Sequence, residues 1–410
     1  MKLLLKNPSS VVTCSSSGKP FKRGAEMKDV GLINDADIYI EDGIIKQIGK
    51  IEVDSDCEVM DVSGKIVVPG FVDSHTHAIF AGTREREFAM RARGMTYCQI
   101  AKAGGGILET VRQTRNAQKS KLRSQAERRI DKMLSWGTTT IEIKSGYGLD
   151  FKNEIKILEA ANELKDESLS DVVVTFLGAH AIPQEHINNR ETYIEILTGE
   201  LIPYIARKNL AEFCDVFCDE WFYTIQEAEK ILSTARENGL KLKMHADELS
   251  ANGGVKLATE LKATSVDHLE NISLDEIMLL AKSDTVGVVL PAVAAYLRSK
   301  PAPAREMIDN NCAVAIASDF NPGTSMVDNM QTVMWLAVSL NKMTVEEALN
   351  AATINAAAAV GLSDKFGSIE VGKQADMLIV DAQNYSYLPY HFTENKISKV
   401  VKNGTVLEFS

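Results

Sequence analysis

Eight short apolar runs, separated by segments long enough to form helices, constrain the fold of this chain more than any other feature. Most of the runs lack the alternation of a strand with one solvated face, which is typical of parallel strands buried on both faces. Apolar residues at helical spacing between them, as in 224–237, favour strand–helix repeats. We therefore predict an α/β fold with a TIM-like (β/α)8 barrel over residues 66–366, whose functional residues lie at the carboxyl ends of the strands. The runs span residues 66–73, 138–144, 172–177, 215–218, 240–244, 265–267, 286–290 and 314–317.

Both ends of the chain are rich in strand and turn signals. Asp42-Gly43 separates two alternating apolar runs, and Asn403-Gly404 does the same near the other end. Such dipeptides are strong hairpin signals. A further apolar run covers residues 375–380. We predict that residues 1–65 and 367–410 together form one small β-sandwich domain beside the barrel.

The segment 78–136 is too long for a simple crossover between two barrel strands. It contains an arginine-rich loop, three consecutive glycines at 104–106, and a polar stretch near 116–135 that we predict to be helical. No Gly-Lys-Ser/Thr follows the glycines, so they do not form a phosphate loop. We expect them to be flexible or tightly turned beside the mouth of the site.

Charge and cysteine usage exclude several classes of protein. The formal net charge is −11 and no basic stripe occurs, which argues against a nucleic-acid partner. No apolar run approaches the roughly 18 residues of a membrane span, and the N-terminal run is too short for a secretory signal. Six scattered cysteines without a Cys-x-x-Cys motif indicate free thiols in a reducing cytoplasm. These features favour a cytoplasmic protein that acts on a small molecule.

Histidines gather where the apolar runs end. Residues i and i+2 of a strand share a face, so His75 and His77 project side by side. Imidazole and carboxylate are zinc ligands, and a catalytic site needs about three protein ligands and one open position. One such residue alone would more often be structural, but their joint placement on one barrel rim predicts a metal site. Five of the seven histidines and one aspartate lie at these ends, namely His75, His77, His180, His245, His268 and Asp319, whereas His186 and His391 do not.

Residues 69–77 resemble the first-strand signature of the amidohydrolase superfamily of metal-dependent hydrolases. A closer resemblance, to the imidazolonepropionase family, covers nearly the whole chain. It rests on residues 82–88, Tyr97 with 104–107, 142–149, 176–180, 245–248 and 318–323. The resemblance implies hydrolysis of 4-imidazolone-5-propanoate to N-formimidoyl-L-glutamate in histidine degradation.

The same resemblance implies the cofactor, the partners and the site residues. It implies one Zn or Fe ion per chain, held by His75, His77, His245 and Asp319, and a homodimer. Some superfamily members bind two metals through a lysine on strand four, but residues 215–218 contain none, which favours a single ion. Position 324 is often serine in the family, and threonine keeps its hydroxyl. The residues implied around the substrate are Arg84, Tyr147, His180, Glu248, His268, Asn321, Gly323 and Thr324.

These residues suggest a division of catalytic roles. Asp319 could accept a proton from the attacking water, and His268 could polarise the ring carbonyl. Glu248, one helical turn beyond His245, could carry a proton to the leaving nitrogen. The sequence leaves the division of labour among Asp319, Glu248 and His268 open. Arg84, together with Tyr147, could clamp the single carboxylate of the substrate.

Two other interpretations remain open from the residues. The nearest is another single-metal cyclic amidohydrolase or nucleobase deaminase, which would share the histidines and Asp319. Arg84 and Tyr147 argue against it, because a neutral base needs no carboxylate clamp. The second is a catalytically inactive, metal-holding scaffold, which would be expected to lack a ligand or a proton-transfer residue, and none is missing.

Overall fold

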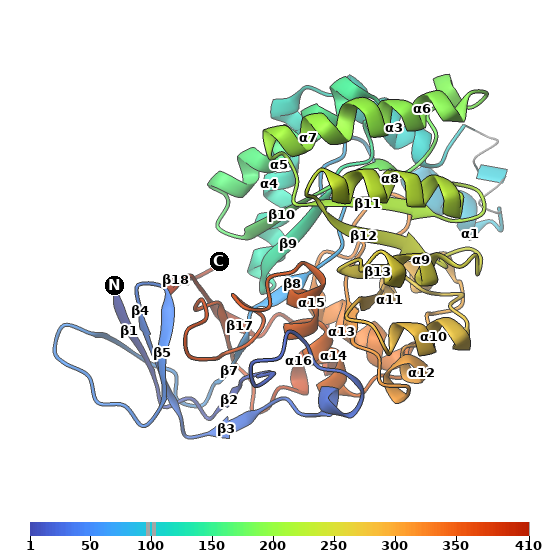
Figure 1. The fold of residues 1–410 in the computed structure, drawn as a ribbon. Coiled ribbons are helices and arrows are strands. Elements are labelled where there is room, and N and C mark those ends of the chain that lie inside the picture. Colours follow the sequence, from blue (N-terminus) through green and yellow to red (C-terminus); the bar gives the residue numbers. More distant parts are fainter. Residues whose placement is uncertain (96–98, 101–103, 410) are drawn as a thin grey trace.

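The computed structural model describes residues 1–95, 99–100 and 104–409. Tyr97, which contributes to the family resemblance, lies outside the described residues. Within them the chain forms a barrel and, beside it, two smaller sheets built from both ends of the chain (Figure 1). No helix in the described ranges is both long and apolar enough to cross a membrane.

The predicted barrel is confirmed. Its eight strands are all parallel and follow one another in chain order. Beyond the last strand, Asp319 N–H donates to the His75 carbonyl at 3.0 Å and His77 N–H donates to the Phe320 carbonyl at 3.0 Å, which joins the two ends of the sheet. The strands are β8 (Phe71–Asp73), β9 (Thr138–Lys144), β10 (Asp171–Ala179), β11 (Phe213–Cys218), β12 (Lys241–Ala246), β13 (Ser265–His268), β14 (Val286–Val289) and β15 (Val314–Ile316).

Helices cover the outside of the barrel (Figure 1). The predicted helix over 224–237 is α8 (Ile225–Glu237), which begins after Thr224. The Thr224 hydroxyl accepts the Glu227 N–H and the Glu227 carboxylate accepts the Thr224 N–H, so the first turn is capped from both sides. The other helices between or after the barrel strands are α5 (Phe151–Glu167), α6 (Arg190–Ile196), α7 (Ile202–Lys208), α9 (Gly254–Glu260), α10 (Leu274–Leu280), α11 (Pro291–Leu297), α12 (Ala304–Asp309), α13 (Met330–Ser339), α14 (Val345–Ala351) and α15 (Ile354–Ala359).

The long segment after β8 carries three described helices. They are α1 (Glu85–Ala92), α3 (Ile107–Asn116) and α4 (Lys119–Ser135). The sequence predicted the last of these, with a start near 116, but not α3, which begins directly after the three glycines. Gly106 has a φ of 84° at the start of α3, a conformation that favours glycine. The glycines therefore form the turn that leads into α3.

Two antiparallel-rich sheets make up the smaller part of the molecule. One orders its strands β5-β4-β1-β6 and the other β18-β17-β16-β7-β2-β3. Buried side chains of both sheets, among them Leu3, Ile38, Val67 and Met377, share one core. The strands are β1 (Lys2–Lys6), β2 (Ser10–Val12), β3 (Leu32–Asn34), β4 (Asp37–Glu41), β5 (Ile44–Gly49), β6 (Glu58–Asp61), β7 (Ile66–Pro69), β16 (Met377–Val380), β17 (Ile397–Lys402) and β18 (Thr405–Leu407); the short helix α16 (Tyr387–Tyr390) precedes β17.

The prediction of a single barrel run over 66–73 is wrong in its first half. Residues 66–69 form β7, which pairs antiparallel with β16 and parallel with β2 in the smaller part. Only β8, after Gly70, pairs with β9 in the barrel. A Cβ at Gly70 would lie 2.2 Å from Thr139 Oγ1, so the chain passes too close to β9 for a side chain here. We accordingly propose that the two domains divide at Gly70.

Candidate active site

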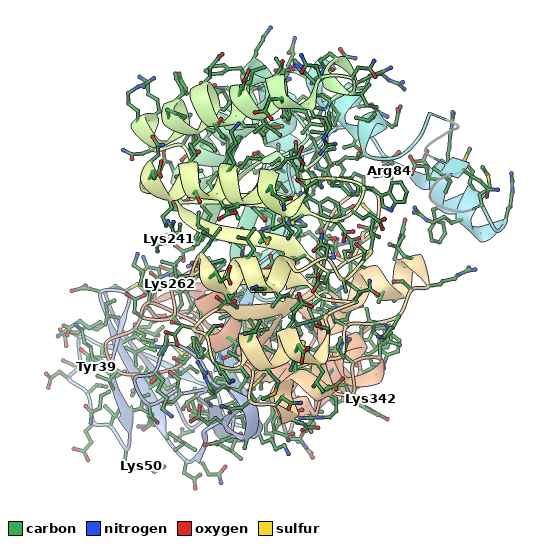
Figure 2. The ribbon with its side chains drawn as sticks, turned by 45° about the vertical axis from the view of Figure 1, so that its right-hand side comes forward. Tyr39, Lys50, Arg84, Lys241, Lys262 and Lys342 are labelled. Carbon is green, nitrogen blue, oxygen red and sulfur yellow. The ribbon has the colours of Figure 1, made fainter. Side chains whose placement is uncertain are left out.

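A pocket of about 700 Å³ opens at the carboxyl ends of the barrel strands. Figure 2 shows Arg84, which lines it, on the side of the barrel away from Tyr39 and Lys50 of the smaller domain. His75 lies beneath the pocket and is fully buried. Gly323 is not a lining residue. The other residues expected from the sequence all line the pocket, namely His77, Arg84, Tyr147, His180, His245, Glu248, His268, Asp319, Asn321 and Thr324.

Ligand atoms of the expected metal set converge at the base of this pocket. Ring nitrogens of His75, His77 and His245 lie within 4.8 Å of one another. In a second group, ligand atoms of His75, His268 and Asp319 also lie within 4.8 Å of one another. Asp319 Oδ1 lies 3.5 Å from His75 Nε2 and 3.4 Å from His77 Nε2. Ligands about 2.05 Å from a tetrahedral zinc ion would be about 3.3 Å apart. His75 Nε2, His245 Nε2 and Asp319 Oδ1 are buried without a hydrogen-bond partner among the described residues, so the donor set fits a metal ion.

Two buried aspartates orient the histidine rings. Asp267 Oδ2 lies 2.6 Å from His75 Nδ1, and Asp215 Oδ1 lies 3.1 Å from His245 Nδ1. A carboxylate at Nδ1 holds the proton there and leaves the Nε2 lone pair free for a cation. Burial lowers the pKa of His75 and His77 well below the ordinary value, so both rings are neutral at pH 7. Neutral imidazole is the form that binds metals.

Lys144 connects the two aspartates from inside the barrel. Its Nζ lies 2.7 Å from Asp215, 3.0 Å from Glu142 and 3.6 Å from Asp267, and all four side chains are fully buried. Burial alone would lower the pKa of Lys144, but the three carboxylates outweigh burial and raise it. Lys243 Nζ lies 3.3 Å from Glu142 and 3.9 Å from Asp267. The cluster of Glu142, Lys144, Asp215, Lys243 and Asp267 therefore surrounds both histidine-orienting carboxylates. Burial alone would raise the pKa of Asp215, but His245 and Lys144 outweigh burial and lower it.

The loop after β15 presents Asp319 and is braced by Asn321. The Asn321 side-chain carbonyl accepts the N–H groups of Gly323 at 2.8 Å and Thr324 at 2.9 Å, while its amide donates to the Thr324 hydroxyl at 2.7 Å. Thr324 Oγ1 in turn lies 3.3 Å from Asp319 Oδ2. Asn321, expected beside the substrate, thus uses its side chain to shape the loop that carries Asp319.

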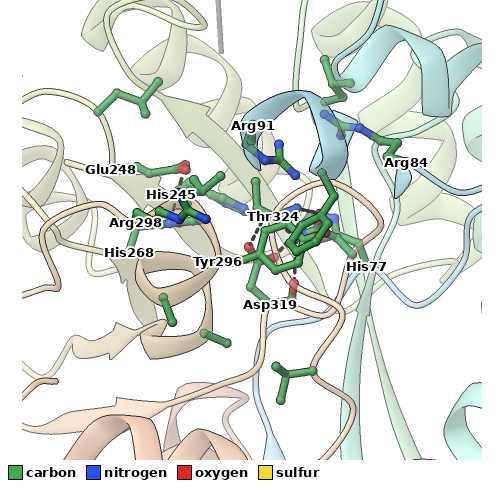
Figure 3. Close-up of a pocket in the computed structure, with 18 of the residues that line it drawn as sticks. His77, Arg84, Arg91, His245, Glu248, His268, Tyr296, Arg298, Asp319 and Thr324 are labelled. Atoms are coloured by element: carbon green, nitrogen blue, oxygen red, sulfur yellow. Dashed lines mark hydrogen bonds and ion pairs between the residues drawn. The ribbon is translucent and has the colours of Figure 1, made fainter. Parts of the chain in front are cut away.

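Glu248 and His268 face each other on one wall of the pocket (Figure 3). His268 Nδ1 lies 3.5 Å from Glu248 Oε2 and 3.7 Å from Glu270 Oε2. Burial, reinforced by the nearby Glu270, raises the pKa of Glu248 well above its ordinary value. Burial lowers the pKa of His268 to about 3 and raises the pKa of Glu270 to about 8. The raised pKa of Glu248 favours its protonated form, and the lowered pKa of His268 keeps the facing imidazole neutral at pH 7. Glu248 follows β12 in a bend, so the expectation that it lies one helical turn beyond His245 is wrong.

Arg84 is already paired within the chain. Its Nε and Nη2 donate to Glu87 Oε2 at 2.9 and 2.7 Å, and both side chains are buried. The other Glu87 oxygen accepts the Gly106 N–H at 2.8 Å. A Cβ at Gly323 would lie 2.1 Å from Arg84 Nη1, so that glycine gives the arginine its space. The arginine expected as a free carboxylate clamp is thus largely neutralised by Glu87.

Aromatic rings form another part of the pocket lining. His180 stacks on His77 with ring centroids 4.9 Å apart, and its Nδ1 donates to the Gly146 carbonyl at 3.2 Å. Tyr147 lies 5.4 Å from His180 and 5.7 Å from His77 between ring centroids. The two histidines outside the site, His186 and His391, contact tyrosines elsewhere.

Backbone strain gathers at these strand ends. Asp247, His268, Leu269 and Asp319 have φ values of 56°, 84°, 71° and 47°. Such conformations are uncommon for residues other than glycine, cost about 1–3 kcal/mol each, and often occur at functional sites. Here the sharp turns aim His268 and Asp319 at the same point.

Sequence reasoning missed several charged residues that the structure places in or under the site, among them Asp215, Asp267, Lys144 and Glu270. Asp215, Asp267 and Lys144 lie within predicted strands, and Glu270 follows one. A charged residue inside an otherwise apolar, doubly buried strand must be paired, and that is the signal that could have found the first three. Glu270 carries no such signal, because it lies beyond the strand.

Comparisons with known proteins agree with this geometry. Residues 66–407 match the amidohydrolase family. The imidazolonepropionase of Alkaliphilus oremlandii is 45% identical over 98% of this chain and 97% of its own length. The imidazolonepropionase of Thermoanaerobacter pseudethanolicus is 46% identical over 93% of this chain and 92% of its own. A mutant atrazine chlorohydrolase of Arthrobacter aurescens TC1, complexed with zinc and atraton, has the same fold: the TM-score is 0.75 at 17% identity, over 99% of this chain and 95% of that one.

Proposed function

This chain belongs to the amidohydrolase family and, within it, to the imidazolonepropionases, and from that premise we propose how its pocket opens the ring of 4-imidazolone-5-propanoate. The reaction is a metal-dependent hydrolysis of a cyclic amide, and its product is N-formimidoyl-L-glutamate. The observation that carries the proposal is the convergence of His75 Nε2, His245 Nε2 and Asp319 Oδ1, which lack hydrogen-bond partners among the described residues, at the base of a pocket also lined by Glu248.

One zinc or iron ion per chain would be held by His75, His77, His245 and Asp319. An ion of this kind supplies Lewis acidity, which brings the pKa of a water molecule down to about 7. The count of one follows from β11, which offers no lysine to bridge a second ion. The ammonium group of Lys144 lies against Asp215, which disfavours another cation there.

Asp319 and His268 act on the attacking water and the carbonyl. The water oxygen adds to the ring carbonyl carbon while Asp319 takes one of its protons, because its carboxylate lies at the base of the pocket. His268 is neutral at pH 7, so it polarises the carbonyl as a hydrogen-bond donor rather than as a cation.

Glu248 completes the reaction at the leaving nitrogen. The bond between the carbonyl carbon and the ring nitrogen breaks, and the nitrogen needs a proton. Glu248 holds one at neutral pH because burial raises its pKa. It donates that proton, and the proton taken by Asp319 restores it, so that one water molecule is consumed in each turnover.

The rest of the pocket positions the substrate. Tyr147 and His180 flank the ring, Asn321, Gly323 and Thr324 form the loop beneath it, and Arg84 lies at the side that receives the carboxylate arm. We further propose a homodimer, on family resemblance, and a cytoplasmic location, in keeping with the five described cysteines, all free thiols.

The test is direct turnover of freshly prepared 4-imidazolone-5-propanoate. Loss of its ultraviolet absorbance should accompany formation of N-formimidoyl-L-glutamate, with one ion per chain by elemental analysis. A panel of nucleobases assayed for ammonia release should give no activity. Turnover of a nucleobase in place of the imidazolone would refute the proposed substrate, and two tightly held ions per chain would refute the single-metal site.

A further inference from the structure

Three arginines line the pocket, and they differ in which groups surround their positive charge. Arg84 is neutralised by Glu87, as described above. Arg298 is exposed to solvent. Arg91, near the end of α1, is only partly exposed, and the structure gives it no ion pair with any described residue.

Arg91 is held in place but keeps unpaired donors. Its Nη2 donates to the Gly323 carbonyl at 2.8 Å, and its guanidinium carbon lies 5.1 Å from the centre of the Tyr296 ring. Its Nε and Nη1 are buried and have no hydrogen-bond partner among the described residues. Figure 3 shows its guanidinium directed into the pocket above Thr324, with Arg84 to the right of it in the view.

Buried donors on a full positive charge are costly when they stay unpaired. The group that would satisfy them is an anion with two oxygens. Nη2 carries two hydrogens, and the Gly323 carbonyl accepts one of them. The other hydrogen lies parallel to an unpaired hydrogen on either Nη1 or Nε. These two parallel hydrogens can bind both oxygens of a carboxylate. The Tyr296 ring and the Gly323 carbonyl fix the plane of the fork.

We propose that Arg91, rather than Arg84 alone, supplies the charge that neutralises the substrate's carboxylate arm. The inference rests on the proposed function, because that substrate carries one carboxylate. Gly323 lies on the same loop as Asp319, so the bond from Arg91 to its carbonyl sets the carboxylate subsite at a fixed place relative to the metal ligands. Arg84 is neutralised by Glu87. It offers the substrate only its Nη1 group, and it shapes the pocket wall.

The test compares binding of a charged and an uncharged ligand. Imidazole-4-propanoate and imidazole-4-propanamide differ only in the charge of the arm, and neither can be hydrolysed at the ring. Calorimetry on the metal-loaded protein should find that Arg91→Met weakens binding of the propanoate by about 10- to 100-fold, the range for losing a hydrogen bond to a charged group. Binding of the propanamide should change by less than about threefold on the same grounds.

Controls separate this role from a structural one. Arg93→Met, an exposed arginine at the end of the same helix, should leave both affinities unchanged. Arg91→Gln keeps an N–H for the Gly323 carbonyl but removes the charge, so it should behave as Arg91→Met and replaces it if that variant is unstable. Metal content and thermal midpoint should match the parent.

Each outcome decides the proposal. Equal losses for propanoate and propanamide, or an unchanged propanoate affinity in both Arg91 variants, would overturn it. If the parent binds the propanoate through Arg91 but does not turn over the imidazolone, the proposed function fails and the carboxylate subsite stands. If the parent turns over the imidazolone and the Arg91 variants match it, only this inference fails.

Discussion

Replacing Lys144 with methionine should strongly lower the free energy of unfolding of the metal-free protein, because Lys144 is fully buried among carboxylates. Its Nζ is the closest cation to Asp215, at 2.7 Å, and to Glu142, at 3.0 Å. In the parent, the formal charges of three buried acidic and two buried basic side chains sum to −1. Without Lys144 the charge becomes −2, and only Lys243 remains beside Glu142 and Asp267.

The size of the effect follows from this burial. Removing one partner of a buried ion pair costs about 3–5 kcal/mol, because the remaining charge stays uncompensated. With an unfolding entropy of about 2.1 cal/mol/K per residue, a 410-residue chain should lose about 4–6 °C in thermal midpoint. Differential scanning calorimetry on chelator-treated protein, at one scan rate, measures this. Exposed Lys152→Met is the matched control and should shift the midpoint by less than 1 °C, as about 0.5 kcal/mol or less is expected for a surface change.

A second substitution tests the electrostatic reason. Glu142→Gln in the Lys144→Met background restores the net charge of −1 without touching the aspartates that orient His75 and His245. The double variant should recover part of the lost midpoint, which gives a coupling energy between the two sites. A Lys144→Met protein as stable as the parent, or a double variant less stable than Lys144→Met, would refute the reasoning.

The remaining predictions concern the pocket itself. His245→Ala should lose both bound metal and activity, and a fully active, metal-free variant would remove His245 from the site. Glu248→Gln should keep metal and fold but lower turnover by about 10²-fold, the usual worth of general acid–base catalysis, and turnover within about a factor of two of the parent would exclude it as proton carrier. Arg84→Lys should lower catalytic efficiency by about tenfold with unchanged metal content, since an ammonium group cannot make both contacts to Glu87; parental kinetics would contradict this. In the metal-free protein the pKa of Glu270 rises from 4.5 to about 8, so the stability that its proton gives is full below pH 4.5 and is lost as pH rises to 8. Glu270→Gln should therefore show a flatter midpoint between pH 5 and 8, and an equal or steeper fall would contradict the assignment.

The barrel, and the convergence of the residues expected to bind a metal, could be predicted because their signals are local. Each apolar run is short and continuous. The polar residue that follows it lies at the rim of the barrel, regardless of which strands pair with that run. His75, His77, His245 and Asp319 therefore came together as expected, from strands far apart in the chain. Glycine turns at both chain ends similarly indicated the smaller β domain.

What the sequence could not predict depends on partners distant in the chain. Residues 66–69 belong to the smaller domain because β16 and β2 offer them edges, and Pro69-Gly70 within the run does not show which sheet each half joins. Arg84 has the spacing of a ligand-binding residue, yet Glu87 takes its charge. Arg91 has no distinguishing pattern and is directed into the pocket by a carbonyl on a loop 232 residues away in sequence.

Because β7 pairs with β16, this part of the sheet cannot be completed until late in the synthesis of each chain. Residues 66–69 are synthesised about 300 residues before residues 377–380, which complete their sheet. At about 5–20 residues per second, that strand edge waits roughly 15–60 s on the ribosome without its neighbour. During this time the apolar faces of β7 and β2 are open to wrong partners, while the barrel beyond Gly70 can already begin to form. Nascent-chain aggregation should thus depend in part on this seam, and its share of chaperone demand should end when β16 emerges.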